Sequence, residues 1–364
     1  MKITVDKTEL IKVLQRVQGI VEKRNTLPIL SNVLIEGANG GITIMATDLE
    51  IFIKDICPAD VDEKGAITVN ARKLFEIVRS LPEERVDINI AEDKMGIVSG
   101  KVKYNIMGIP AKEFPAFPSV PEDSLARIDQ KLLSDMIDKT AFAVSTDETR
   151  YNINGFFLQK EDSRIRMVTT DGHRLALIEK DYDSIPVDTE GVILPRKGVV
   201  ELRKLFEEEG SFFFGISEKN ATVKKDTTIM NIRLIEGEFP DYKQVIPKEN
   251  DKRVVADRTE LLEALKRVSI LASDRIKGVK FSFSTGRLVL SSSNPDIGDV
   301  VDELDVEYQG QELEVAFNAR YFIDVFSVME EDRVVMEFKD SVSPGVVKPE
   351  GSEDYLYIVM PMRL

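Results

Sequence analysis

The chain has 364 residues, of which 43% are apolar and 31% charged, with a net charge of −15, one cysteine, one histidine and no tryptophan. This length allows two or three domains, each with its own core. No apolar stretch is long enough to cross a bilayer, the N-terminal segment lacks the apolar region of a signal peptide, and one cysteine excludes an internal disulfide framework. We therefore expect a soluble cytoplasmic protein without a membrane partner.

Apolar residues at helical spacing predict helices at 8–24, 71–80, 129–145, 196–206, 257–275 and 319–329. The first helix has Thr8 as its expected N-cap. Alternating patterns and turn residues predict strands in the first third at 29–36, 42–47, 51–57, 66–69, 86–90, 96–99 and 103–107. The same signals predict later strands at 155–158, 164–169, 191–194, 211–217, 221–224, 228–235, 279–284, 287–291, 313–317, 333–338 and 355–361.

Three of these helices repeat at equal intervals. Arg72, Arg196 and Arg320 are 124 residues apart, and each follows a short strand-like run. Equal spacing within one chain is the signature of an internal repeat. Each copy has the order helix, strands, helix, strands, which predicts an α+β layer of antiparallel sheet covered by two helices. Proline-rich stretches place the domain boundaries near 120 and 247, giving domains at 1–120, 121–247 and 248–364.

The positive charges are concentrated on the helices. Arg196 and Arg203 lie two turns apart on one stripe, and Arg72 and Arg79 have the same relation, whereas the third copy has Ser327 at the matching position. The six predicted helices together carry +6, although the whole chain carries −15. A solvated amphipathic helix also explains one basic face. A repeated basic face in an acidic protein instead favours one surface that meets phosphate.

Residues suited to catalysis are scarce. One histidine, His173, and one cysteine, Cys57, cannot assemble a His/Cys metal cluster. No glycine-rich phosphate loop, nucleophile elbow or His-Glu-x-x-His helix is present. We expect no catalytic site, no metal and no cofactor. Two alternatives stay open: a nuclease or other hydrolase with a carboxylate-only metal site, and an acidic scaffold that never meets DNA.

Six motifs occur in order along the whole chain: TLPIL at 26–30, ATDLE at 46–50, TDGHRLA at 170–176, PRKGV at 195–199, FPDY at 239–242 and VMPMRL at 359–364. Together they resemble the bacterial DNA polymerase III beta subunit, the sliding clamp. The resemblance implies a processivity factor that encircles duplex DNA and tethers the replicative polymerase. It also implies a head-to-tail homodimeric ring of six similar domains, with helices lining the hole and sheets outside.

Geometry supports a dimeric ring over a ring made by one chain. Packed helices lie roughly 10 Å apart, so six helices close a circle about 19 Å across, which leaves about 9 Å after the helix thickness is subtracted. Twelve helices leave about 28 Å. A duplex whose major groove alone is about 12 Å wide passes only through the larger hole.

The resemblance and the basic stripes together give the expected site residues. The DNA contacts are Arg24, carried over from the family, and Arg72, Arg79, Arg196, Lys197, Arg203 and Tyr151. The family's partner-peptide pocket corresponds to Arg150, Ile153, Thr170, Gly172, His173, Arg174, Leu175, Pro240, Val245, Val342, Ile358, Met360, Pro361, Met362 and Arg363. The dimer seam corresponds to Ile270 and Leu271 against Tyr104 and Ile106, with Lys73, Asp302 and Glu303 as charged partners.

The implied partners are double-stranded DNA, a second copy of the chain and proteins that carry short clamp-binding motifs. These proteins are the replicative polymerase alpha subunit, the clamp loader, other polymerases, and mismatch-repair or ligase proteins. The chain departs from the family at Gln244, where a basic residue is common just before the pocket residue Val245. This departure puts one partner hydrogen bond in doubt.

Overall fold

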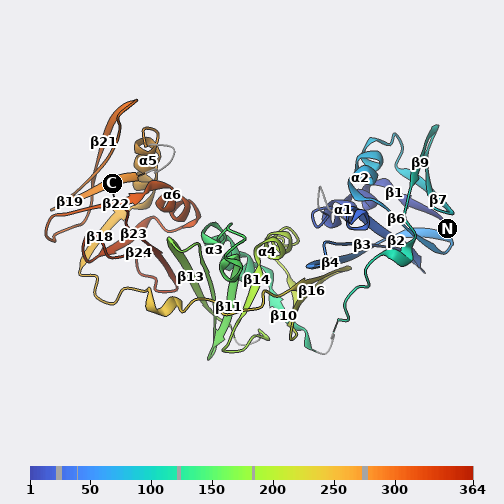
Figure 1. Ribbon diagram of the computed structural model, residues 1–364, viewed down its shortest axis with the longest axis horizontal. Coiled ribbons are helices and arrows are strands. Elements are labelled where there is room, and N and C mark those ends of the chain that lie inside the picture. Colours follow the sequence, from blue (N-terminus) through green and yellow to red (C-terminus); the bar gives the residue numbers. More distant parts are fainter. Residues whose placement is uncertain (22–26, 39, 121–123, 183–184, 273–277, 364) are drawn as a thin grey trace. The chain divides into compact units, whose positions relative to one another are not determined.

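The computed structural model describes residues 1–21, 27–38, 40–120, 124–182, 185–272 and 278–363 (Figure 1). These residues form two compact units. The first contains Met1–Lys131, Ser184–Pro186 and Lys197–Leu234, and the second contains Leu132–Asp183, Val187–Arg196 and Ile235–Leu364. The second of the three predicted domains therefore contributes to both units.

The first unit contains two antiparallel sheets. A five-stranded sheet has the order β5 (Ala59–Glu63), β1 (Lys2–Asp6), β7 (Arg85–Ala91), β8 (Lys94–Ser99) and β9 (Val102–Met107). An eight-stranded sheet has the order β10 (Ala126–Asp129), β15 (Ser211–Ile216), β16 (Asn220–Lys225), β17 (Thr228–Arg233), β4 (Ile51–Cys57), β3 (Gly41–Thr47), β2 (Asn32–Ala38) and β6 (Gly65–Asn70).

Helices cover the sheets of this unit. Helix α1 (Lys7–Val17) packs against α2 (Ala71–Ser80) and against β3 and β4, as Figure 1 shows. Leu10, Leu14 and Val17 are buried on the inner stripe of α1, as their helical spacing predicts. The opposite stripes of α1 and α2 carry the charged residues. Helix α4 (Arg196–Arg203) belongs to this unit from Lys197 onward.

The second unit repeats this architecture. Its eight-stranded sheet has the order β14 (Val192–Pro195), β11 (Gly155–Glu161), β12 (Arg164–Thr170), β13 (Arg174–Asp181), β25 (Tyr355–Val359), β24 (Gly345–Pro349), β23 (Arg333–Phe338) and β18 (Lys252–Asp257). Its four-stranded sheet has the order β21 (Gly298–Asp305), β20 (Arg287–Asn294), β19 (Gly278–Ser284) and β22 (Leu313–Asn318). Its helices are α3 (Gln130–Thr140), which starts in the first unit, α5 (Arg258–Ser269) and α6 (Ala319–Val328), and α5 packs against α6.

Strand pairing joins each repeat to the next. In the first unit β4 of the first repeat pairs antiparallel with β17 of the second, with Phe52 opposite Asn231. In the second unit β13 of the second repeat pairs in the same way with β25 of the third, with Leu175 opposite Ile358. Each eight-stranded sheet is therefore built from two repeats, which explains why the compact units do not follow the predicted domains.

The helix predicted at 71–80 has the predicted bounds, and the helix predicted at 319–329 ends one residue earlier. The other four helices are shorter than predicted by more than one residue. Helix α1 ends at Val17 instead of 24, and its N-cap is Asp6, not Thr8, because the Asp6 carboxylate accepts the Glu9 N–H at 3.0 Å. The chain turns after α1 so that Ile20 is buried. Residues 22–24 of that prediction lie outside the described residues.

The other three helices end early for local reasons. In α3 the Thr140 hydroxyl donates to the Met136 carbonyl at 2.7 Å, and a short 3-10 helix follows at Ala141–Ala143, where the prediction has one helix over 129–145. Helix α4 ends at Arg203, although the prediction extends to 206. After Arg203, the backbone N–H groups of Leu205 and Phe206 donate to carbonyls three residues earlier, which is the hydrogen-bond pattern of a 3-10 turn. Helix α5 is capped by Asp257 and ends at Ser269, and residues 273–275 of its predicted range are not described.

Seven strands were missed: β1, β5, β10, β13, β18, β21 and β24. Strand β21 has no fully buried residue, so it lacks the apolar alternation that marks a half-buried strand. Strand β13 lies between the predicted strands at 164–169 and 191–194. Both strands owe their conformation to the neighbours with which they pair.

The two proline-rich linkers pack on the sheets through aromatic side chains. Phe117 meets Phe52 of β4 edge to face at 6.0 Å between ring centroids, and Lys54 lies over the Phe117 ring. Phe239 stacks on Phe157 of β11 at 4.9 Å. The repeated Phe-Pro motifs thus tie the linkers to the sheets.

Candidate nucleic-acid and partner-binding surfaces

The two arginines predicted on α2 are accessible to solvent. Arg79 is exposed and Arg72 half-buried, two helical turns apart. Within the described part of the chain neither takes part in an ion pair. Because α2 buries Leu74 and Val78, the arginines are presented on a different stripe of the helix. Their geometry suits contacts with phosphate groups.

The cations of α4 differ from one another. Arg196 is exposed, and Arg203 is half-buried. Lys197 is engaged within the protein: its ammonium pairs with Asp48, whose side chain is almost fully buried, and donates to the Ile20 carbonyl at 3.1 Å. Lys197 therefore ties α4 to the turn after α1 and to the β3–β4 turn. Much of its charge is compensated by Asp48.

The remaining predicted DNA contacts are Arg24 and Tyr151. Arg24 lies outside the described residues. Tyr151 is exposed and begins a short 3-10 helix at Tyr151–Ile153 in the second unit. Its ring lies against Gly237, a glycine with positive φ.

Many predicted pocket residues meet where β12, β13 and β25 end. The Thr170 hydroxyl donates to the Arg174 carbonyl at 2.7 Å, and the Met360 N–H donates to the His173 carbonyl at 2.9 Å. Leu175 and Ile358 are opposite each other and belong to one buried cluster with Tyr242.

The other pocket residues surround this cluster from neighbouring segments. Val245 donates its N–H to the Tyr242 carbonyl at 3.2 Å, and 46% of the residue is exposed. Arg150 donates to the Asp171 carbonyl beside Gly172, while Ile153 is buried. Pro240 precedes the Tyr242 turn, Pro361, Met362 and Arg363 follow β25, and Val342 lies in the loop between β23 and β24. Val245, Val342 and Met360 are the exposed apolar members of the set.

Arg174, one of the predicted pocket residues, is buried and ion-paired. Its side chain is only 9% exposed and pairs with Asp171 at 3.1 Å and with Asp324 of α6 at 2.7 Å. The guanidinium also lies over the rings of Phe142 and Tyr321. Burial works against its charge, but Tyr357 and the two carboxylates outweigh burial and hold the pKa of Arg174 above its ordinary value. Arg174 thus joins β13 to α6 beneath the pocket.

We expect Arg174→Ala to destabilise the second unit by about 3 kcal/mol, because it leaves two carboxylates without their buried partner. Urea unfolding followed by circular dichroism measures the loss. Arg333→Ala is the matched control, because it removes an exposed arginine that also bridges two carboxylates, Glu307 and Glu350, and should lower the stability far less. Equal midpoints for the two variants would contradict the structural role of Arg174.

The predicted seam residues lie at two sheet edges and one helix end. Tyr104 and Ile106 are on β9, an edge strand that pairs with β8. Asp302 and Glu303 are on β21, an edge strand that pairs with β20, and they form ion pairs with Arg267 and Arg287 of the same chain. Lys73 pairs with Glu76 at 2.8 Å. The charged seam residues therefore already have partners within one chain.

Ile270 is the most exposed large apolar residue in the described part of the chain, at 76%. It forms the C-cap of α5, and the half-buried Leu271 follows it. Apolar side chains exposed beside an unpaired sheet edge are typical of a surface that another protein chain covers.

Among the described residues no three His, Cys, Asp or Glu side chains form a group that could hold a metal ion. His173 is exposed in the turn before β13. None of the helices in the described ranges is both long and apolar enough to span a membrane.

These features define a class: a repeated antiparallel α+β protein with basic stripes on its helices and with exposed apolar residues near its sheet edges. Models of the N-terminal, central and C-terminal domains of the DNA polymerase III beta subunit match residues 1–118, 127–241 and 243–363. The beta sliding clamp of Pseudomonas putida is 36% identical over the full length of both chains. The chain therefore belongs to the DNA polymerase III beta subunit family, the sliding clamps.

Solved structures agree with this assignment. A sliding clamp from Bartonella birtlesii bound to griselimycin is 36% identical, with a TM-score of 0.95 and full coverage of both chains. A clamp from Bacillus subtilis is 30% identical, with a TM-score of 0.96, and the match covers 100% of this chain and 99% of that one. The function is that of a DNA sliding clamp, a processivity factor rather than an enzyme, and the hydrolase alternative has no support.

Proposed function

We propose that two copies of the chain close head to tail around duplex DNA and hold polymerases on it through the pocket beside β13 and β25. The full-length match to three beta-subunit domains carries this proposal. We also propose that the domains are 1–120, 121–247 and 248–364. The buried Cys57, whose pKa burial raises to about 12, suits a reducing cytoplasm.

The strand pairing within the chain supports ring closure. Strands β4, β13 and β21 are equivalent in the three repeats, and so are β17, β25 and β9. Two of these strand pairs, β4–β17 and β13–β25, form within the chain. The third members of the two equivalent sets are β21 and β9, and each lies at the edge of its own sheet. Two head-to-tail copies would pair both edges and leave neither unpaired, and closure is a general way in which proteins remove sheet edges.

The repeat also sets the register of that seam. Phe52 and Leu175 each pair with the last residue of the preceding strand, as Gly298 does, so the three positions correspond. Phe52 pairs with Asn231 across the internal junction, and Asn231 corresponds to Asn105. Placing Gly298 of one copy opposite Asn105 of the other brings Asp302 opposite Lys101. Opposite charges facing across a strand pair are stabilising.

For DNA we propose that Arg72, Arg79, Arg196 and Arg203, together with Arg24 and Tyr151, contact the phosphate backbone. Contacts to phosphate carry no sequence information, so they allow the ring to slide. Lys197 is assigned a smaller part because Asp48 compensates its charge. The ring itself, not tight contact, would keep the clamp on DNA.

For partners we propose that Val245, Val342 and Met360 receive the apolar side chains of short linear motifs. Their exposure above a buried cluster supports this, and methionine adapts to varied ligands. A related clamp from Bartonella birtlesii was solved with griselimycin bound, so a clamp of this fold does take a ligand. The replicative polymerase alpha subunit, the clamp loader and repair proteins would compete for this site.

The test of the ring is topological. The clamp is loaded onto nicked circular DNA, passed through a sizing column, and the DNA is then cut once. We expect the clamp to stay with the circle and to leave after linearisation. Equal retention on circular and linear DNA, or release from both, would refute encirclement.

A further inference from the structure

The eight-stranded sheet of the first unit has one face toward the helices and an outer face away from them. Asp55 of β4 is fully buried and accepts a hydrogen bond from Arg16 of α1 at 2.7 Å, so it lies on the helix side. Side chains alternate along a strand, so Phe52 and Lys54 lie on the outer face. The linker residue Phe117 packs there, against Phe52 and beneath Lys54.

One row of side chains on the outer face joins four strands. Phe213 of β15 is opposite Lys224 of β16, which is opposite Ile229 of β17. Ile229 is in turn opposite Lys54 of β4. Neighbouring strands lie about 4.8 Å apart, so this outer row is roughly 14 Å long. Phe213 is 46% exposed, and the other three residues are half-buried.

The outer face is positively charged around this row. Strands β15, β16, β17 and β4 together contain one carboxylate, Asp55, which lies on the helix side. Their cations on the outer face are Lys54, Lys224 and Arg233. These four strands therefore present three cations and no carboxylate outward, in a chain whose net charge is −15.

The corresponding face of the second unit carries a carboxylate beside its cation. The strand pairs around the two internal junctions make Lys348 equivalent to Lys224 and Glu337 equivalent to Gly215. Glu337 pairs with Lys348 at 3.3 Å. The first unit has a glycine at the position of this carboxylate, which makes its outer face the more positive of the two.

A buried acceptor lies next to the outer row. Asn231 of β17 is 2% exposed, and its side-chain amide donates to the Thr222 hydroxyl at 3.0 Å. Its Oδ1 has no hydrogen-bond partner among the residues that the structure describes. Asn231 occupies the position that Ile358 has beside the partner pocket. Buried polar oxygens are nearly always satisfied by a donor, and the N–H groups of a bound peptide are donors of the required kind.

We propose that the outer row, with the adjoining Phe52, Phe117 and Asn231, docks an acidic linear segment of a partner protein. The cations attract its carboxylates, and Phe213 covers one of its apolar side chains. The site uses the first internal junction, as the pocket beside β13 and β25 uses the second. It is a separate site that requires neither DNA nor that pocket.

A peptide fits this face better than single-stranded nucleic acid. Proteins that bind single strands stack successive bases on exposed aromatic faces. Phe213 is the one aromatic residue of the outer row. Phe52 and Phe117 meet edge to face, and the Lys54 ammonium lies 4.6 Å from the centre of the Phe117 ring, so these rings are already engaged.

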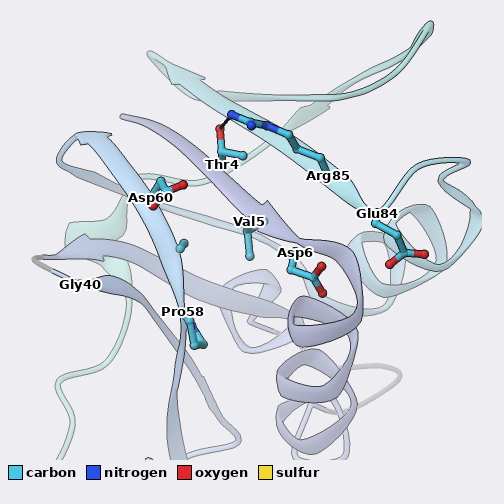
Figure 2. A pocket seen from close by; sticks show the side chains of 9 residues that line it. Thr4, Val5, Asp6, Gly40, Pro58, Asp60, Glu84 and Arg85 are labelled. Atoms are coloured by element: carbon cyan, nitrogen blue, oxygen red, sulfur yellow. Dashed lines mark hydrogen bonds between the residues drawn. The ribbon is translucent and has the colours of Figure 1, made fainter.

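Two other surfaces of the first unit supply controls. A pocket of about 590 Å³ is lined by Asp6, Asp60, Glu84 and Arg85, as Figure 2 shows. Three carboxylates around one guanidinium repel an acidic peptide, so Arg85→Glu is a charge reversal away from the proposed site. A basic pocket of about 850 Å³ among α1, α2 and α4 includes Arg79, and an acidic ligand that merely imitated DNA would bind there.

The experiment measures binding of a labelled acidic copolymer of glutamate and tyrosine to the intact clamp by fluorescence anisotropy. Lys54→Glu should raise the dissociation constant at least about tenfold, because it sets a carboxylate against those of the ligand. Phe213→Ala removes an exposed side chain and should raise it about tenfold through lost apolar contact. Arg85→Glu and Arg79→Gln should keep the parent value. Thermal unfolding midpoints confirm that the variants are folded.

The remaining outcomes separate the explanations. Parent affinity in both Lys54→Glu and Phe213→Ala would overturn the docking site. Loss of binding in Arg79→Gln alone would place the copolymer on the basic helices, and loss in the double variant Val245→Ala with Met360→Ala would place it in the partner pocket; either result overturns the proposal. Labelled oligothymidylate tests for nucleic acid: if Lys54→Glu weakens its binding and leaves copolymer binding unchanged, the face is a nucleic-acid site and the proposal fails.

Discussion

Replacing Ile270 and Leu271 together by alanine is expected to convert the dimer into monomers. Both residues follow the last turn of α5, and Ile270 is largely exposed in the single chain. Covering each side chain in a seam contributes about 2 kcal/mol. A ring of two chains has two seams, so four truncations cost roughly 8 kcal/mol and raise the dissociation constant nearly a million-fold. Sedimentation velocity at decreasing concentration measures the change.

The control for this prediction is Ile56→Ala, which removes an exposed isoleucine of β4 outside every proposed surface. We expect this variant to remain dimeric and both proteins to keep the parent circular dichroism spectrum. A double variant that sediments as a dimer at nanomolar concentration would show that the seam lies elsewhere. Loss of helical signal would instead indicate damage to α5.

The second large effect concerns partner binding. We expect Val245→Ala combined with Met360→Ala to weaken binding of a clamp-binding peptide about 100-fold, because each truncation removes roughly 1.5 kcal/mol of apolar contact. Both side chains are exposed beside the cluster of Leu175 and Ile358, so their loss leaves the core intact. Fluorescence anisotropy of a labelled peptide measures the affinity.

Phe213→Ala is the matched control, because Phe213 is as exposed as Val245 but lies on β15 of the first unit. It should leave peptide affinity unchanged. The pocket variant should also keep its dimer and its retention on circular DNA. Parent-like peptide affinity in the pocket variant would remove Val245 and Met360 from the site.

Much of the site was predictable where a pattern is local. The basic stripe of α2 follows from helical spacing, and the structure places Arg72 and Arg79 on it as predicted. Lys12 and Arg16 of α1 carry the same signal, four residues apart, and were not singled out. Both line a pocket together with residues of α4, more than 100 residues away in the sequence.

Other assignments needed tertiary contacts. Nothing in the sequence pairs Lys197 with Asp48, and only the structure shows that Asp48 compensates the charge of this predicted DNA contact. Arg174 is predicted as a pocket residue, and only the structure shows that it starts β13, which pairs with β12 and β25, and that its guanidinium pairs with Asp324. Ion pairs between distant segments leave no periodic trace in the sequence.

The sequence by itself determined the threefold repeat, the α+β class, the basic stripes and the family, because each is carried by local spacing or by motifs in order. Only the tertiary structure decided where one repeat joins the next, which cations are compensated, and that β9 and β21 are among the edge strands of the described residues. The physical reason is that a strand edge or a buried ion pair is a property of two segments. Its energy depends on contacts that neither segment encodes alone.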